Sequence, residues 1–208
     1  HPERFVIELI GDAEAECSGS IAIPYLSVDG CKDSSLELVD VLTCQKFTIR
    51  PKIVVNATGG WVDSTQIRLG LEGGLMGGTR GIHLVLRKPE LTAQLKGRML
   101  YFETRDCRAC AVLPLDETHV YVGTTDIRVD DPDDRRYSKQ EIDYLFDALR
   151  DVAPGERFSQ DDIVFIMSGI RPLPAQDTES TGQISRGHRL DVLPAGDDRG
   201  FVTLTIVG

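Results

Sequence analysis

Short apolar runs broken by turn residues fill the first fifty positions and predict strands. We expect strands at residues 4–10, 20–28 and 36–42. The β-branched run at 53–55 leads into small residues, which predicts a buried strand followed by a tight turn. Six glycines within residues 70–81 indicate either a flexible crossing between units or a backbone that approaches another group closely.

The middle of the chain alternates apolar and polar residues and predicts an antiparallel meander. Its strands are expected at 82–86, 99–103, 109–113 and 119–124, with polar turns between them. Further strands are expected at 162–167, 183–186, 188–193 and 201–206.

One helix is predicted between Ser138 and Pro154. Ser138 and Glu141 have the spacing of a capping box, in which each side chain accepts from the other residue's backbone amide. A single apolar stripe follows at helical spacing, made of Ile142, Leu145, Phe146 and Leu149. Strands and helix together predict an α+β fold.

The charge and the chain ends narrow the class of protein. Of the 208 residues, 33 are acidic and 23 basic, and the formal net charge of −10 argues against nucleic-acid binding. No run approaches the ~20 apolar residues of a membrane-spanning helix. The chain begins without Met, shows no signal-peptide pattern and stops after the run at 201–206. We therefore expect a cytoplasmic piece of a larger protein.

The cysteines and acidic runs do not predict a metal site. Five cysteines at irregular spacing indicate reduced thiols rather than a disulfide framework. Cys107 and Cys110 form a CxxC pair, but no second pair exists to complete a zinc site, and the stretch is strand-like. The acidic run at 130–134 lacks EF-hand spacing, so we read it as a solvated loop.

Two local groups could bind or activate a ligand. Ala57, Thr58 and Gly59 follow the strand at 53–55, where small residues let a ligand lie against the backbone; the alternative is a plain strand-end turn. His83 enters a strand just after glycines, where an imidazole serves either as a general base or as a structural residue.

Arg171 and Arg186 are the candidates for anion binding. Arg171 is flanked by apolar residues and by Pro172, so we expect its guanidinium to be held in place. Two such groups grip a phosphate or carboxylate bidentately, whereas the alternative is a pair of salt bridges to nearby carboxylates.

Seven longer segments stand in a definite order along the chain: IVVNATGGWVD at 53–63, GGTRGIHLV at 77–85, YFETR at 101–105, YVGTTD at 121–126, EIDYLFDAL at 141–149, DDIVFIMSGIRPL at 161–173 and TGQISRGH at 181–188. Together they resemble the FAD-dependent glycerol-3-phosphate dehydrogenase family, within the D-amino-acid-oxidase-like flavoproteins. The resemblance runs from about Cys44 to the last residue.

The resemblance implies a Rossmann-like FAD domain that carries an antiparallel-sheet substrate domain. It assigns residues 1–75 to part of the FAD-binding domain, 76–180 to the substrate-binding domain and 181–208 to a return segment of the FAD-binding domain. The family oxidises sn-glycerol 3-phosphate to dihydroxyacetone phosphate by hydride transfer to FAD. Electrons then pass to a quinone, which implies a peripheral contact with the cytoplasmic face of a membrane.

Residue roles also follow from the resemblance. Ala57, Thr58 and Gly59 are expected beside FAD, and His83 acts as general base or orients the substrate hydroxyl. Arg171 and Arg186 bind the phosphate, or polarise the C2 oxygen. The family motif at 124–126 has no role that we can assign from the sequence.

The chain also departs from the family. The GxGxxG fingerprint does not occur in it, so we expect this fragment neither to hold FAD tightly nor to turn over. Ile82, Cys107 and Leu115 stand where Ser, Gly and Trp are frequent. Two alternatives stay open: a sister flavin oxidoreductase acting on another polyol phosphate or a 2-hydroxy acid, and a non-catalytic anion-binding module.

Overall fold

The chain divides into two compact units, which are described separately here. The structure is a computed structural model that describes residues 2–196 and 199–208. One unit holds residues up to Val54 together with Arg68–Gly70 and Pro194–Val202. The other holds Val55–Ile67, Leu71–Leu193 and Thr203–Gly208. The domain boundaries expected from the family resemblance stay a prediction.

The first unit begins with a helix rather than a strand. The strand expected at 4–10 is wrong, because these residues belong to helix α1, Pro2–Glu16. Phe5, Val6, Leu9 and Ile10 recur in pairs four residues apart, which is a helical rather than a two-residue period. Their side chains are exposed.

An antiparallel three-stranded sheet follows helix α1 along the chain in this unit. Its order is β1 (Leu26–Lys32), β2 (Ser35–Asp40) and β3 (Lys46–Ile49). The strand expected at 36–42 is confirmed as β2. Of the strand expected at 20–28, only its end is strand, because Pro24 has no amide hydrogen to give to a ladder.

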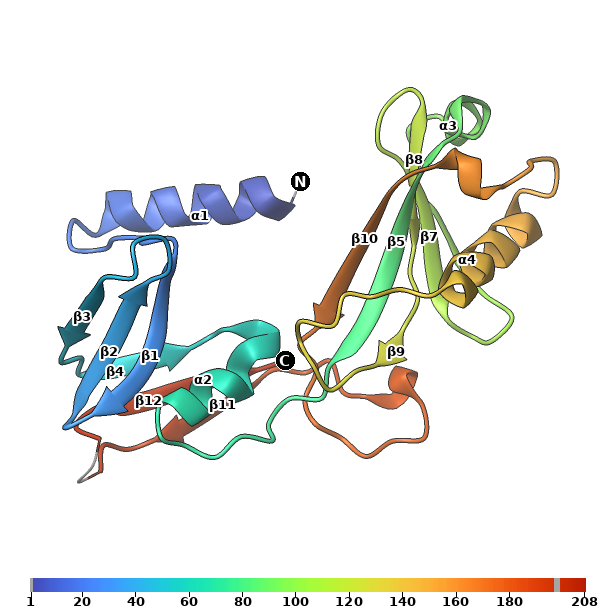
Figure 1. Cartoon of the computed structure of the whole chain (residues 1–208). Helices are drawn as coiled ribbons and strands as arrows, with labels where there is room; N and C mark the ends of the chain where they lie inside the picture. The colour runs from blue at the N-terminus through green and yellow to red at the C-terminus, as the bar shows by residue number, and fades with distance from the viewer. Residues whose placement is uncertain (1, 197–198) are drawn as a thin grey trace. The chain divides into compact units, whose positions relative to one another are not determined.

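A six-stranded antiparallel sheet forms the centre of the second unit (Figure 1). Strands β10, β5, β8, β7 and β6 follow one another in that order, and β9 pairs with β5. Their bounds are β5 Thr79–Arg87, β6 Leu100–Glu103, β7 Ala109–Pro114, β8 His119–Gly123, β9 Ile127–Arg128 and β10 Ile163–Arg171. The predicted meander is confirmed in β6, β7 and β8, whereas its expected first strand, β5, pairs with β8 instead of β6 and has β10 on its other side.

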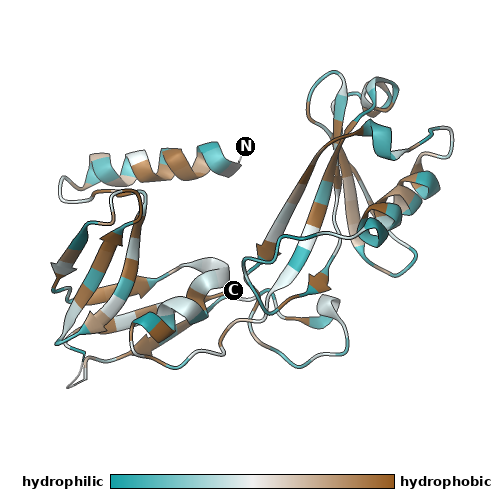
Figure 2. Cartoon of the chain, in the orientation of Figure 1, coloured by the Kyte–Doolittle hydropathy of each residue, from teal (hydrophilic) through white to brown (hydrophobic). Residues whose placement is uncertain are grey.

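Helices α3 (Pro89–Leu95) and α4 (Lys139–Val152) contribute to the core on one face of this sheet. Figure 1 shows α4 alongside the strands, and in Figure 2 the strands are mostly apolar while α4 carries both kinds of residue. The core consists of Ile82, Leu84, Leu86, Leu91, Cys110, Val112, Val120, Val122, Ile142, Leu145, Phe146, Leu149 and Phe158. The predicted α4 stripe therefore faces the sheet.

The capping box of α4 is confirmed. The Ser138 backbone amide donates to Glu141 Oε2 at 2.9 Å, and the Glu141 amide donates to Ser138 Oγ at 3.3 Å. Each bond satisfies an amide that has no partner within the helix, which explains why the helix begins here.

The remaining three-stranded sheet has the order β11 (Arg189–Leu193), β12 (Val202–Val207) and β4 (Ile53–Asn56). The prediction of a buried strand at 53–55 is wrong in its burial, because Ile53 and Val55 are 57% and 55% exposed. Apolar character alone does not decide whether another element covers a strand. The 3₁₀ turn η1 (Gly59–Trp61) and helix α2 (Val62–Arg68) follow β4.

Two other segments bear on the sequence predictions. The strand expected at 183–186 is wrong, because a 3₁₀ turn at Thr181–Gln183 begins the segment and is held by Ser180 and Gln183. The glycine-rich segment includes a close approach: a Cβ at Gly78 would lie 2.9 Å from Ile170 Cγ2. Another short 3₁₀ turn, Gln160–Asp162, precedes β10. Among the helices of the described residues, none is both long and apolar enough to cross a membrane.

Candidate active site

The sheet face opposite α4 carries two of the predicted site residues. Successive strand residues point to opposite faces, so His83 of β5 lies on the other side from the buried Ile82 and Leu84. Gly123 of β8 is the register partner of His83, and Arg171 at the end of β10 pairs with Thr79. Strand register thus brings His83 and Arg171 to one face.

The His83 ring is held between a tyrosine and a glycine. It stacks on Tyr121 with ring centroids 4.6 Å apart and an interplanar angle of 13°. A Cβ at Gly123 would lie 1.9 Å from His83 Cδ2, so the ring occupies the space above this glycine. Burial, assisted by the nearby Arg171 cation, lowers the pKa of His83 to about 4. The imidazole is therefore neutral at pH 7 and able to accept a proton.

Arg171 is fixed by the segment that follows β8. Its Nη1 donates to Asp126 Oδ1 at 3.0 Å, and its Nη2 donates to Thr124 Oγ1 at 2.8 Å and to the Thr125 carbonyl at 3.2 Å. Burial lowers the pKa of Arg171, while Asp126 opposes this shift and Arg186 adds to it. Arg171 therefore forms a salt bridge to a carboxylate, one of the two arrangements expected from the sequence. Its guanidinium also lines a cavity, which is described next.

A cavity of about 580 Å³ brings the three predicted substrate residues together. His83, Arg171 and Arg186 all line it, with Thr124, Asp126 and Thr181 among the other contributors. Arg186 is exposed in the loop before β11, and the Ser185 amide next to it donates to Gln176 Oε1 at 2.9 Å. Two cations and a neutral imidazole on one cavity suit an anionic substrate that loses a proton.

Sequence reasoning left the motif at 124–126 without a role, and the structure supplies one. Thr124 and Asp126 hold Arg171 on the cavity side, whereas Thr125 between them is buried on the other side. Thr125 Oγ1 accepts from the Ile82 amide at 3.0 Å and donates to Glu141 Oε1 at 3.2 Å. The two-residue alternation around a buried threonine is the signal that could have revealed this role.

Glu141 connects this motif to the helix start. It is 3% exposed, and its Oε2 accepts from Arg80 Nη2 at 2.9 Å as well as from the Ser138 amide. One carboxylate therefore serves the helix cap, a buried ion pair and the Thr125 hydroxyl. Arg80 and Glu141 were not among the predicted site residues.

Gly81 and Gly123 were also not predicted as site residues. A Cβ at Gly81 would lie 2.3 Å from Arg171 Nη2, so this glycine leaves room for the guanidinium, as Gly123 does for the imidazole. The glycines themselves were visible in the sequence, but their strand partners were not.

The predicted cofactor residues form an open turn after β4. Ala57 and Thr58 are exposed, and Gly59 has a positive φ of 60°. The buried Asn56 shapes this turn: its Nδ2 donates to the Val62 carbonyl at 3.0 Å, and its Oδ1 accepts from Thr58 Oγ1 at 2.7 Å. Residues 57–59 themselves carry only short side chains, so the turn leaves backbone accessible to a ligand.

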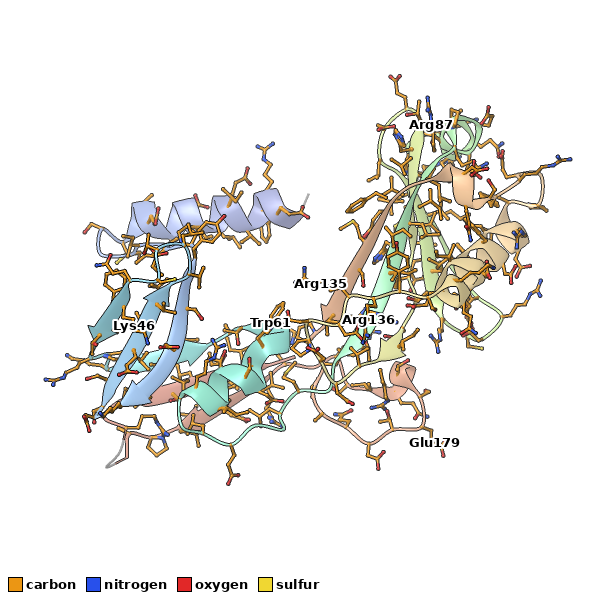
Figure 3. The ribbon with its side chains drawn as sticks, viewed as in Figure 1. Lys46, Trp61, Arg87, Arg135, Arg136 and Glu179 are labelled. Carbon is orange, nitrogen blue, oxygen red and sulfur yellow. The ribbon has the colours of Figure 1, made fainter. Side chains whose placement is uncertain are left out.

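This turn is connected to the end of β10, although its residues do not line the 580 Å³ cavity. A Cβ at Gly59 would lie 3.9 Å from Pro172 Cβ, immediately after Arg171. Trp61, labelled in Figure 3, donates from Nε1 to Asp133 Oδ1 at 3.2 Å. The role of residues 57–59 stays a prediction.

The CxxC residues differ in their surroundings. Cys107 is exposed at the turn between β6 and β7 with a positive φ of 59°, the backbone region that favours glycine. Cys110 is buried in β7, and burial raises the pKa of its thiol to about 11. Both thiols are free.

Comparison with known proteins identifies the class. The family model described as "FAD dependent oxidoreductase" matches residues 1–208. The chain therefore belongs to the FAD dependent oxidoreductase family, whose fold combines helices with antiparallel sheets as observed here.

Within this class, the chain is similar to glycerol-3-phosphate dehydrogenases. It is 33% identical to the glycerol-3-phosphate dehydrogenase of Synechocystis sp., over 91% of this chain and 36% of that protein. It is 32% identical to the aerobic glycerol-3-phosphate dehydrogenase of Staphylococcus haemolyticus, over 88% of this chain and 33% of that protein. The chain thus spans about a third of the length of these relatives.

Solved structures agree at the level of the fold. The glycerol-3-phosphate dehydrogenase of Bacillus halodurans, complexed with FAD, superposes with a TM-score of 0.71 and 26% identity. That match covers 92% of this chain and 36% of the Bacillus chain. Glycine oxidase from Geobacillus kaustophilus, with a TM-score of 0.51 and 21% identity over 92% of this chain and 45% of its own, shares the fold.

Proposed function

We propose that this chain forms the substrate side of an FAD-dependent dehydrogenase that oxidises sn-glycerol 3-phosphate to dihydroxyacetone phosphate. The observation that carries the proposal is the convergence of His83, Arg171 and Arg186 on one cavity. Similarity to named glycerol-3-phosphate dehydrogenases supports the choice of substrate.

The proposed reaction separates a proton and a hydride from C2 of the substrate. His83 accepts the proton of the C2 hydroxyl, for which its low pKa keeps it unprotonated. Bound FAD would supply the hydride acceptor, and loss of the hydride from C2 together with the hydroxyl proton gives the carbonyl of dihydroxyacetone phosphate. Residues 57–59 would lie against the cofactor through their backbone.

The two arginines bind the charged end of the substrate. Arg171 is oriented by Asp126 and Thr124, so its guanidinium enters the complex with little loss of side-chain freedom. Arg186 approaches from the loop before β11 and lines the same cavity. Both contacts are charge-assisted hydrogen bonds to phosphate oxygens.

The resemblance also supports the remaining assignments. We propose residues 1–75 and 181–208 as parts of an FAD-binding domain and 76–180 as the substrate-binding domain. We propose a quinone as the electron acceptor, with the protein at the cytoplasmic face of a membrane. Quinone reduction by membranes supplied with the protein and substrate tests the acceptor.

A substrate panel on the protein that carries this chain tests the function. Glycerol 3-phosphate should reduce the flavin, whereas glycerol, which lacks the phosphate, should be a poor substrate. Arg171→Ala should raise KM or lower kcat at least about tenfold, the loss expected for a charged hydrogen-bonding partner. Equal activity on unphosphorylated 2-hydroxy acids would favour a sister oxidoreductase, and binding of phosphate without any turnover would favour an anion-binding module.

A further inference from the structure

A third arginine lines the cavity beside the residues assigned above. Arg108 follows the turn between β6 and β7 and contributes to the same cavity as Arg171 and Arg186. Its side chain is 39% exposed, so the guanidinium is partly held by protein and partly accessible from the cavity. Neither the sequence motifs nor the proposed mechanism uses this residue.

The turn holds Arg108 in a defined position. Its Nε pairs with Asp106 Oδ2 at 3.0 Å, and its backbone amide donates to Thr104 Oγ1 at 3.1 Å. Its Nη1 donates to the Asp126 carbonyl at 3.0 Å. A guanidinium has five N–H donors, so these side-chain contacts leave donors for a ligand.

Asp126 accepts hydrogen bonds from both Arg108 and Arg171. Its carbonyl accepts from Arg108, and its carboxylate accepts from Arg171. The two guanidinium groups therefore bond to one residue. Three arginines line the cavity, and two carboxylates pair with them: Asp126 with Arg171, and Asp106 with Arg108.

With three arginines against two carboxylates, the cavity keeps a net positive charge, which attracts a dianion more strongly than a monoanion. A phosphate monoester carries nearly two negative charges at pH 7, because its second pKa is about 6. A carboxylate carries one charge, and an unphosphorylated polyol carries none. The chain as a whole carries a net charge of −10, so the sign of the charge in the cavity is opposite to that of the molecule.

We propose that Arg108 is a third phosphate-binding residue and makes the site select phosphate monoesters over singly charged and neutral substrates. This inference rests on the proposed function, because it assigns a role at the same site. Arg108 contacts the substrate phosphate directly and takes no part in moving the proton or the hydride.

Arg108→Ala in the FAD-loaded protein that carries this chain is the test. KM for glycerol 3-phosphate should rise about tenfold or more, with kcat within about threefold of wild type, because a charge-assisted contact common to ground and transition states is lost. The inhibition constant of inorganic phosphate should rise in parallel. Arg108→Lys, which keeps the charge without the planar fork, should recover part of the affinity.

Arg105→Ala is the matched control. Arg105 lies in the same turn, but its side chain is 85% exposed and pairs with Asp151 of α4, and it does not line the cavity. Its replacement should leave KM and the phosphate inhibition constant within about twofold. Thermal unfolding of each variant verifies that the sheet is intact.

Two results would overturn the assignment of Arg108. One is an unchanged KM in an active, folded Arg108→Ala variant. The other is a fall in kcat at unchanged KM, which would mean that Arg108 acts only through Asp126. If wild type does not oxidise glycerol 3-phosphate, the proposed function fails instead. In that case, thermal stabilisation of the protein by inorganic phosphate tests the role of Arg108 separately. If Arg108→Ala abolishes this stabilisation, Arg108 binds phosphate; if the stabilisation persists in the variant, the proposed role is wrong.

Discussion

His83 and Arg171 occupy space that two glycines leave open. The imidazole lies over Gly123, and the guanidinium lies over Gly81, each too close for an intervening Cβ. Strands seldom tolerate glycine without a reason, because it lowers their stability and packs no side chain. Here both glycines face the cavity side of the sheet, where the close approach of His83 and Arg171 is the reason.

Gly123→Ala should displace the His83 ring while leaving the sheet intact. The new Cβ would lie 1.9 Å from Cδ2, so the ring has to rotate away from its stack on Tyr121. If His83 is the general base, kcat should fall on the order of 10²-fold. Steady-state kinetics of the flavin-loaded protein measure this loss.

Gly169→Ala provides the control for that substitution. Gly169 lies on the same sheet face in β10, opposite Gly81, but no atom lies within 4 Å of its added Cβ. The kcat of the Gly169→Ala variant should stay within about twofold of wild type, as for a surface substitution. Equal losses of kcat in the two variants would show that any added methyl group on this face lowers activity. Such a result would remove the support for His83 as the general base.

The low pKa of His83 predicts the pH dependence of the reaction. A base works in its unprotonated form, so activity is present above its pKa and is lost as the pH falls through it. We therefore expect the acidic limb of kcat/KM, corrected for ionisation of the substrate phosphate, near pH 4 rather than near 6.5. Removing the Arg171 charge should move that limb upward. A limb at 6.5 in wild type would contradict the burial of a functional imidazole.

At the scale of elements, helix α4 supports the site from behind the sheet. Glu141 caps the helix, pairs with Arg80 and accepts from Thr125, while Thr124 and Asp126 on either side hold Arg171. The start of α4 and the end of β8 are therefore joined through one buried carboxylate.

Glu141→Gln should lower the free energy of unfolding by about 2 kcal/mol, because the buried Arg80 loses its closer carboxylate and keeps only Asp134, at 3.7 Å. Ser138→Ala removes only the cap and should cost about 1 kcal/mol. Urea unfolding of the chain measures both changes.

Asp143→Asn is the control within the same helix. Asp143 forms an exposed pair with Lys139 one turn away, and its loss should change the unfolding free energy by no more than about 0.5 kcal/mol. A Glu141→Gln effect as small as this would show that the network is not important for stability.

At the scale of the whole molecule, the chain matches the family model but its sequence contains no dinucleotide-binding fingerprint. The family model covers the entire chain, yet GxGxxG, which places the FAD pyrophosphate at a helix start, does not occur in its sequence. The open turn at 57–59 offers backbone contacts but no cluster of phosphate-binding amides of that kind.

The 208-residue chain by itself should therefore purify without FAD and show no dehydrogenase activity. Its absorption spectrum should lack a flavin band, while cooperative thermal unfolding verifies that it is folded. A yellow, active preparation would contradict this expectation and would place the main cofactor contacts within these residues.

The sequence by itself predicted the features that depend on neighbours along the chain. The capping box and apolar stripe of α4 follow from residues within about four positions of one another, and the meander follows from two-residue alternation and its turns. Motif order was sufficient to select His83, Arg171 and Arg186. Helix α1 was missed because its four-residue apolar period was interpreted as a short strand. The exposure of β4 was missed because burial of a strand depends on which other elements pack against it.

Only the tertiary structure decided which distant residues these side chains meet. Arg171 meets Asp126 across 45 positions of sequence, and His83 meets Gly123 through the register of β5 and β8. Arg108 and Glu141 likewise meet partners that are distant in sequence, Asp126 and Arg80. Local patterns specify which face a side chain takes, whereas strand order and register, set by packing of the whole core, specify its partners.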